Sequence, residues 1–210
     1  MLKAATITKS FSWLTALTAS IVLTCGCTPT GSPERTPVPE PSPSATQAVE
    51  TPAPYTPPAK PYAQMSHEEL FAEADKVLLG VQFWMASIEE GKESENSLNK
   101  AKELVTPRIY GMLVSVAENI KTKGIRVPNS TQLAIRTDKL LDPKVFSGSN
   151  PKPIIVIQAC KDGRALEVLN ANGKVFDHGR LTYDKVGFLI QGEKLVISDY
   201  KSERTEKCPF

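Results

Sequence analysis

The clearest pattern in the sequence is a helical one that begins after Ser66. Ser66 and Glu69 have the spacing of a capping box, in which the two side chains bond the free N–H groups at the start of a helix. The apolar stripe that follows is Leu70, Ala74, Val77, Leu78, Val81, Met85 and Ile88. Its spacing of three and four residues predicts a long amphipathic helix that runs to about Glu90.

Two shorter helical patterns follow a charged break over 91–96. Residues 98–105 place leucine, alanine and valine at helical spacing, and this second helix must end at Pro107 because proline removes a backbone donor. Pro107 suits the first turn of a third helix, and Gly124 suits its end. The apolar stripe of that third helix is Ile109, Leu113, Val116 and Ile120.

After Pro128 the helical period is lost, and short runs rich in branched residues alternate with turn residues. The runs are 133–135, 154–160, 165–169, 181–190 and 195–200. Tight connections at 161–163, Asn172-Gly173 and Gln191-Gly192 favour antiparallel pairing of these runs. Three helices followed by about five or six strands predict an α+β domain, in which N-terminal helices pack on a curved antiparallel sheet.

Residues 1–27 have the organisation of an export signal. Lys3 and Lys9 precede an apolar stretch over 11–24, and the segment holds no acidic residue. The stretch has 14 residues, which is within the ~7–15 of a signal peptide and short of the ~20 that a transmembrane helix needs. We therefore predict that 1–27 is a signal peptide.

A proline-rich segment, 28–63, follows the export signal. It holds 11 of the 17 prolines of the chain and few large apolar residues. Because proline removes backbone donors and little apolar surface is present, burial cannot offset the entropy lost on ordering. We predict a disordered tether over 28–63 and a single domain over 64–210, which is long enough to form a hydrophobic core.

The end of the export signal is the motif LTCGC over 23–27. It resembles the lipobox of bacterial lipoproteins, in which a cysteine after a small residue carries the lipid, palmitate included, and becomes the mature N-terminus. Cys27 follows Gly26 and fits this pattern, whereas the alternative Cys25 follows the bulkier Thr24. The resemblance implies a bacterial protein that is anchored to the cell membrane by lipid, with its domain on the extracytoplasmic face.

Cysteine parity also favours Cys27. Cleavage before Cys27 leaves Cys160 and Cys208 as one pair, whereas cleavage before Cys25 leaves an odd thiol outside the cytoplasm. Structural disulfides form in exported proteins, so parity and export together predict a disulfide between Cys160 and Cys208.

Short motifs within the predicted domain point to a family. They are VIQACKDG over 156–163, NGK over 172–174, and LVISD over 195–199 with Cys208 after it. Together with the order of helices before long strands, they resemble the NTF2-like (SnoaL-like) fold and small secreted lipoproteins of actinobacteria. The resemblance implies a cone of helices over a curved sheet, and the same pairing of Cys160 with Cys208. The residues expected to approach a pocket inside the cone are Asp75, Trp84, Tyr110, Arg136 and Gln158.

Charge and motif content argue against several classes of function. The chain has 25 basic and 23 acidic residues, a formal charge of only +2, so we predict no nucleic-acid partner. Its two histidines are His67, expected in the first turn of a helix, and His178, expected in a glycine-flanked loop. Neither a zinc ligand set nor a nucleotide-binding glycine loop nor a serine-hydrolase elbow is present in the sequence. We predict no metal and no cofactor.

The function predicted from these patterns is binding. We expect a lipid-anchored extracytoplasmic binding or interaction module, whose partner is a cell-envelope protein or a small apolar ligand. No catalytic residues are identified. The alternative is an isomerase, dehydratase or cyclase that uses the NTF2-like pocket, and a third hypothesis is an envelope spacer. A deep cavity with two convergent titratable groups would favour the enzyme, and a filled cone with an exposed apolar patch would favour binding.

Overall fold

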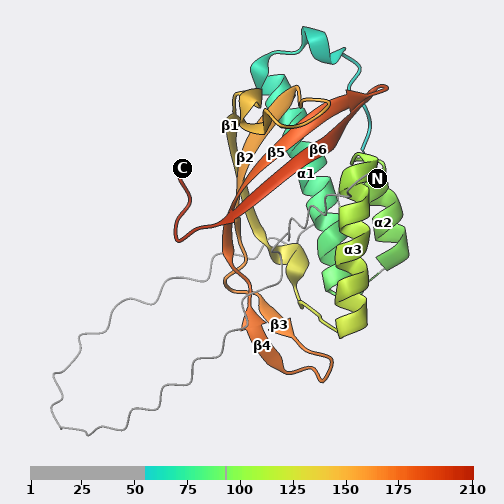
Figure 1. Cartoon of the computed structure of the whole chain (residues 1–210), viewed down its shortest axis with the longest axis vertical. Helices are drawn as coiled ribbons and strands as arrows, with labels where there is room; N and C mark the ends of the chain where they lie inside the picture. Colours follow the sequence, from blue (N-terminus) through green and yellow to red (C-terminus); the bar gives the residue numbers. More distant parts are fainter. Residues whose placement is uncertain (1–54, 93) are drawn as a thin grey trace, which may run out of the picture. The chain divides into compact units, whose positions relative to one another are not determined.

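The computed structural model describes residues 55–92 and 94–210. The predicted signal peptide, Cys25, Cys27 and most of the predicted tether lie outside these residues. Within the part described, three helices come first and the strands follow (Figure 1). The predicted α+β class is therefore confirmed.

The helices begin and end close to the positions that the sequence pattern predicts. Their bounds are α1 His67–Glu89, α2 Ser94–Lys102 and α3 Pro107–Lys123, with a short 3₁₀ turn, η1 Tyr62–Gln64, before them. The capping box of α1 is formed, because Glu69 N–H donates to Ser66 Oγ at 3.2 Å and Ser66 N–H donates to Glu69 Oε2 at 2.6 Å. Pro107 is the first residue of α3, and Gly124 ends it in the left-handed conformation at φ 60°.

The main sheet has four antiparallel strands in the order β1-β2-β5-β6. The strand bounds are β1 Ala134–Leu140, β2 Ile155–Asp162, β5 Leu181–Gln191 and β6 Lys194–Arg204. Two 3₁₀ turns flank β1, namely η2 Ser130–Gln132 before it and η3 Pro143–Phe146 after it. Each strand of this sheet pairs with the next one along the chain, although two further strands, which belong to a second sheet, come between β2 and β5 in sequence.

The chain between β2 and β5 forms a separate two-stranded hairpin of β3 Glu167–Leu169 and β4 Val175–His178. The placement of His178 in a loop was wrong, since His178 is the last residue of β4 and pairs with Glu167. The four residues of β4 are all exposed, so no apolar alternation marks the strand in the sequence. Backbone hydrogen bonds of 3.1 and 2.8 Å between Arg126 and Leu169 tie the hairpin to the segment after α3.

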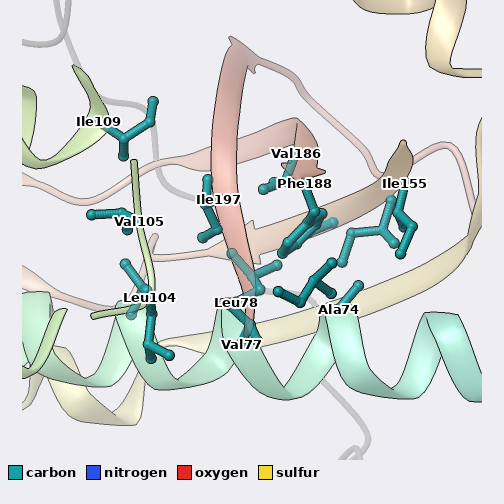
Figure 2. Close-up of a cluster of buried hydrophobic side chains, with 14 of the residues drawn as sticks. Ala74, Val77, Leu78, Leu104, Val105, Ile109, Ile155, Val186, Phe188 and Ile197 are labelled. Atoms are coloured by element: carbon teal, nitrogen blue, oxygen red, sulfur yellow. The ribbon is translucent and has the colours of Figure 1, made fainter. Parts of the chain in front are cut away.

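The core lies between α1 and the sheet (Figure 2). Its most buried side chains include Ala74, Val77 and Leu78 from α1, and Ile155, Val186, Phe188 and Ile197 from the strands. Leu104 and Val105 extend it at the edge of β6, where Thr106 N–H donates to the Ile197 carbonyl at 2.9 Å. The apolar stripe predicted for the first helix is therefore the surface that α1 buries, and the space inside the expected cone is occupied by side chains.

Candidate functional site

Four polar side chains lie at one end of this interior, on the face of the sheet that carries the core residues. They are Lys161 of β2, Asp184 of β5, and Tyr200 and Ser202 of β6. Lys161 Nζ is 3.0 Å from Asp184 Oδ2, and the Tyr200 hydroxyl donates to the same oxygen. Ser202 Oγ donates to Asp184 Oδ1 at 2.5 Å. The side chains of Lys161 and Asp184 are only 10% and 1% exposed, so this is a buried ion pair with hydrogen-bonding neighbours.

The electrostatics of this cluster favour a structural role. Burial works against the charged form of Lys161, but Tyr200 and Asp184 outweigh it and raise the pKa of Lys161. Burial also raises the pKa of Tyr200, so its hydroxyl keeps the proton that it donates to Asp184. A lysine that stays cationic offers no lone pair to act as a base or a nucleophile. The four groups therefore form one hydrogen-bonded network around a buried ion pair.

A further carboxyl, Glu89 at the end of α1, faces the same region. Ser130 Oγ donates to Glu89 Oε2. Burial raises the pKa of Glu89, while the hydrogen bond from Ser130 and the charge of Lys161 lower it in part and Glu90 adds to the rise. The environment thus favours the protonated form of Glu89 more than water does.

We expect Glu89 to make the folded protein less stable as the pH rises. A carboxyl whose pKa is higher when folded binds its proton more tightly in the native state, so stability falls as the pH rises from 4.5 through the raised pKa. Glu89→Gln keeps an acceptor for Ser130 without a charge, so its free energy of unfolding should lack this fall. Urea unfolding between about pH 4 and pH 8 measures the difference. The exposed Glu118→Gln is the control, and parallel pH profiles for wild type and Glu89→Gln would contradict the prediction.

Three of the five residues predicted to approach a pocket lie on helices and point to different neighbours. Asp75 of α1 accepts a hydrogen bond from Thr137 Oγ1 of β1 at 2.7 Å. The ring of Trp84, also on α1, packs beneath Lys100 of α2, whose Nζ is 4.1 Å from the ring centroid. Tyr110 of α3 is partly buried against the core. The structure does not bring these three side chains together around a cavity.

The other two, Arg136 and Gln158, lie on the opposite face of the sheet. They share that face because Arg136 of β1 pairs with Cys160 of β2, two residues from Gln158. Gln158 Nε2 donates to Asp138 Oδ2 at 2.5 Å, and the Tyr183 hydroxyl donates to Gln158 Oε1 at 2.8 Å. We call this side, which faces away from α1, the outer face of the sheet.

The outer face also carries the disulfide. Cys160 and Cys208 are bonded, with their Cα atoms 6.0 Å apart, which confirms the predicted pairing. The bond joins the segment after β6 to the middle of the sheet across 48 positions of sequence. Beside it, Arg136 Nη2 donates to the Phe210 carbonyl at 2.7 Å. The last residues of the chain are thereby held against β1 and β2.

A surface depression of about 590 Å³ lies where the start of α3, the loop before β2, and β5 and β6 meet. Its apolar lining is Pro107, Pro151, Leu189, Ile190 and Val196. Its polar lining includes Thr106, Arg108, Ser149, Asn150 and Asp199. None of these residues was expected from the sequence to line a depression. The available signals were a charged residue directly after the helix-starting Pro107 and a carboxylate two positions after the apolar run over 195–197.

Asp199 organises the polar side of this depression, which we call the Arg108 depression. Arg108 Nη2 donates to Asp199 Oδ1 and to the Ser198 carbonyl, both at 2.6 Å. Ser149 Oγ donates to Asp199 Oδ1 at 2.5 Å, and Ser198 Oγ to Oδ2 at 2.9 Å. A Cβ at Gly187 would lie 3.1 Å from Asp199 Cβ, so glycine leaves room for this packing. The buried carboxylate is therefore saturated with donors and holds Arg108 in place.

Residues 55–92 and 94–210 contain neither a metal-ligand cluster nor a membrane-spanning helix. No group of histidine, cysteine and carboxylate side chains there could hold a metal ion. No helix in the same part of the chain has the length and apolar character needed to cross a bilayer.

Comparison with known proteins adds little to this description. No family model matches the chain, and no curated protein is significantly similar to it. A solved structure with some similarity is the solution NMR structure of a de novo designed β-sheet protein, at 7% identity and a TM-score of 0.31, over 64% of this chain and 91% of that one. A similarity at that score supports no conclusion on fold or function, so the proposals below depend on the residues themselves.

Proposed function

We propose that this protein is a lipid-anchored binding module on the extracytoplasmic face of a bacterial cell membrane. The signal-peptide pattern over 1–27 and the lipobox at Cys27 support export and anchoring. The disulfide between Cys160 and Cys208 supports a location outside the cytoplasm, because structural disulfides are rare where thiols are kept reduced.

The observation that carries the binding proposal is the contrast between a filled interior and a hollowed surface. Apolar side chains occupy the space between α1 and the sheet, and Lys161 and Asp184 satisfy each other at its end. An isomerase, dehydratase or cyclase of the alternative hypothesis would need reactive groups in that space. The Arg108 depression, by contrast, has a volume within the roughly 300–1,000 Å³ of small-molecule sites and a mixed lining.

The proposal includes an NTF2-like fold for the domain. The helices that precede an antiparallel sheet and cover one of its faces support it. The partner is a cell-envelope protein or a small apolar ligand, and the concave shape of the Arg108 depression favours the ligand.

Cys27→Ser is expected to abolish lipid anchoring, because serine has no thiol to carry the acyl chain. Wild-type protein should partition into the detergent phase and incorporate a clickable palmitate, and Cys27→Ser should do neither. Cys25→Ser is the matched control and should behave as wild type. If Cys27→Ser is still labelled and partitions as before, the assignment of Cys27 is wrong; if Cys25→Ser alone loses the label, Cys25 carries the lipid.

A further inference from the structure

We propose that the Arg108 depression binds a singly charged carboxylate on an aliphatic chain, with the carboxylate at Arg108 and the chain along the apolar wall. The inference deepens the proposed function and rests on it, since it names the ligand class of the binding module. The polar side, the apolar side and the charge of the depression each contribute to it.

The polar side of the depression retains donors that the fold does not use. Within the described residues, the hydrogen bonds of Arg108 all come from Nη2, which leaves Nη1 and Nε without a partner, and the side chain is 65% exposed. Thr106 Oγ1 is buried and has no hydrogen-bond partner in the same part of the chain. Asp199 accepts from Arg108, Ser149 and Ser198, and so holds the guanidinium through Nη2.

The apolar side suits a chain of methylenes. Leu189 and Val196 lie opposite each other on β5 and β6, and Pro107 and Pro151 add further apolar surface to the lining. Ile190 at the same site is 43% exposed, so its side chain is accessible to a ligand. Covering this surface contributes about 25 cal/mol for each Å² of apolar area removed from water.

The ion pair of Arg108 with Asp199 favours a ligand that carries one negative charge. The Arg108 guanidinium is already paired with one carboxylate at 2.6 Å, so the pair is neutral as a unit and offers directed N–H donors rather than a strong positive field. A carboxylate accepts such donors in a charge-assisted hydrogen bond. A phosphate dianion would add two charges beside Asp199 with one arginine to balance them. An apolar chain without a head group would make no hydrogen bond to Nη1 or Nε of Arg108.

Photocrosslinking tests the site on the full, lipid-anchored chain in isolated membranes. The probe is octanoic acid with a diazirine on the chain, and the matched neutral probe is the corresponding alcohol. We expect the acid to label peptides that contain 106–108, 148–151 or 189–199, with hexanoate as a competitor and hexan-1-ol as a much weaker one. Equal labelling of these peptides by acid and alcohol overturns the role of Arg108, and no labelling above the rest of the domain overturns the site.

Two variants separate binding from folding. Arg108→Gln should reduce labelling about tenfold, whereas Arg204→Gln, at an exposed arginine in a different depression of about 700 Å³, should leave it unchanged.

Because Arg108→Gln also removes a partner of Asp199, Ile190→Glu provides an independent variant. The side chain of Ile190 is partly exposed, and a carboxylate there repels the probe. Leu79→Glu, at an exposed leucine outside this depression, should label as wild type. Labelling by Ile190→Glu or Arg108→Gln at the wild-type level overturns the proposal.

The outcome of this test is distinct from that of the anchoring test. If labelling at the depression fails while Cys27→Ser loses the lipid, the ligand class is wrong and the location stands. If labelling succeeds in a protein that carries no lipid at Cys27, the binding site stands and the anchoring proposal fails.

Discussion

Asp184→Asn is expected to lower the free energy of unfolding by about 3–5 kcal/mol, the cost of leaving a buried charge without its partner. Lys161 Nζ lies 3.0 Å from Asp184, and its side chain is nearly inaccessible to water. Asparagine has the shape of aspartate but no charge, so the ammonium group loses its counterion while staying buried. Tyr200 and Ser202 also lose their charged acceptor. Urea denaturation followed by circular dichroism measures the loss.

Two companion variants distinguish this mechanism from general damage. Glu103→Gln breaks an exposed ion pair with Lys194 at 3.1 Å and should cost no more than about 1 kcal/mol. Adding Lys161→Met to Asp184→Asn removes the uncompensated charge, so the double variant should be more stable than Asp184→Asn alone. A loss for Asp184→Asn no larger than for Glu103→Gln would show that the ion pair contributes little to the fold.

Removal of the disulfide has the second large effect, an expected loss of about 4 kcal/mol from the chain entropy of a loop of this length. The bond closes 48 positions of sequence, from the middle of β2 to the segment after β6. Without it the unfolded chain regains the freedom that the loop had removed. The measurement is denaturant unfolding of a variant with alanine at both Cys160 and Cys208.

Reduction supplies the matched comparison for the disulfide. Wild-type protein unfolded in the presence of dithiothreitol should approach the stability of the double-alanine variant, whereas the variant itself should not respond to the reductant. Mass mapping under non-reducing conditions should find the Cys160 and Cys208 peptides linked. A double variant as stable as the oxidised wild type would refute the expected contribution.

Local chemistry explains which elements were predictable. The stripe of α1, the Ser66 and Glu69 capping box, and Pro107 at the start of α3 each depend on residues within a few positions of one another. The strands β2, β5 and β6 were visible as apolar runs because β2 and the stretches 186–188 and 195–199 are buried on both faces. β4 was missed for the opposite reason, since its four residues are exposed.

The candidate site was less predictable because it depends on which face of the sheet each side chain takes. Arg136 and Gln158 are on the outer face, whereas Thr137, which bonds Asp75, is on the inner one. A shift of one residue in strand register would exchange these faces, and no short motif records the register. The expectation that Asp75, Trp84, Tyr110, Arg136 and Gln158 line one pocket came from a resemblance to a family, and the geometry places these residues apart.

The sequence by itself determined the class of the fold, the order of its helices and of its apolar strands, and the pairing of Cys160 with Cys208, since periodicity, caps and cysteine parity are properties of the chain read in order. Only the tertiary structure decided that the interior is filled, that Lys161 and Asp184 neutralise each other there, and that the hollow lies at Arg108. The physical reason is distance along the chain. Arg108 meets Asp199 across 91 positions, and that meeting depends on how α3 packs on β6 and on the irregular register between Gly187 and Phe188.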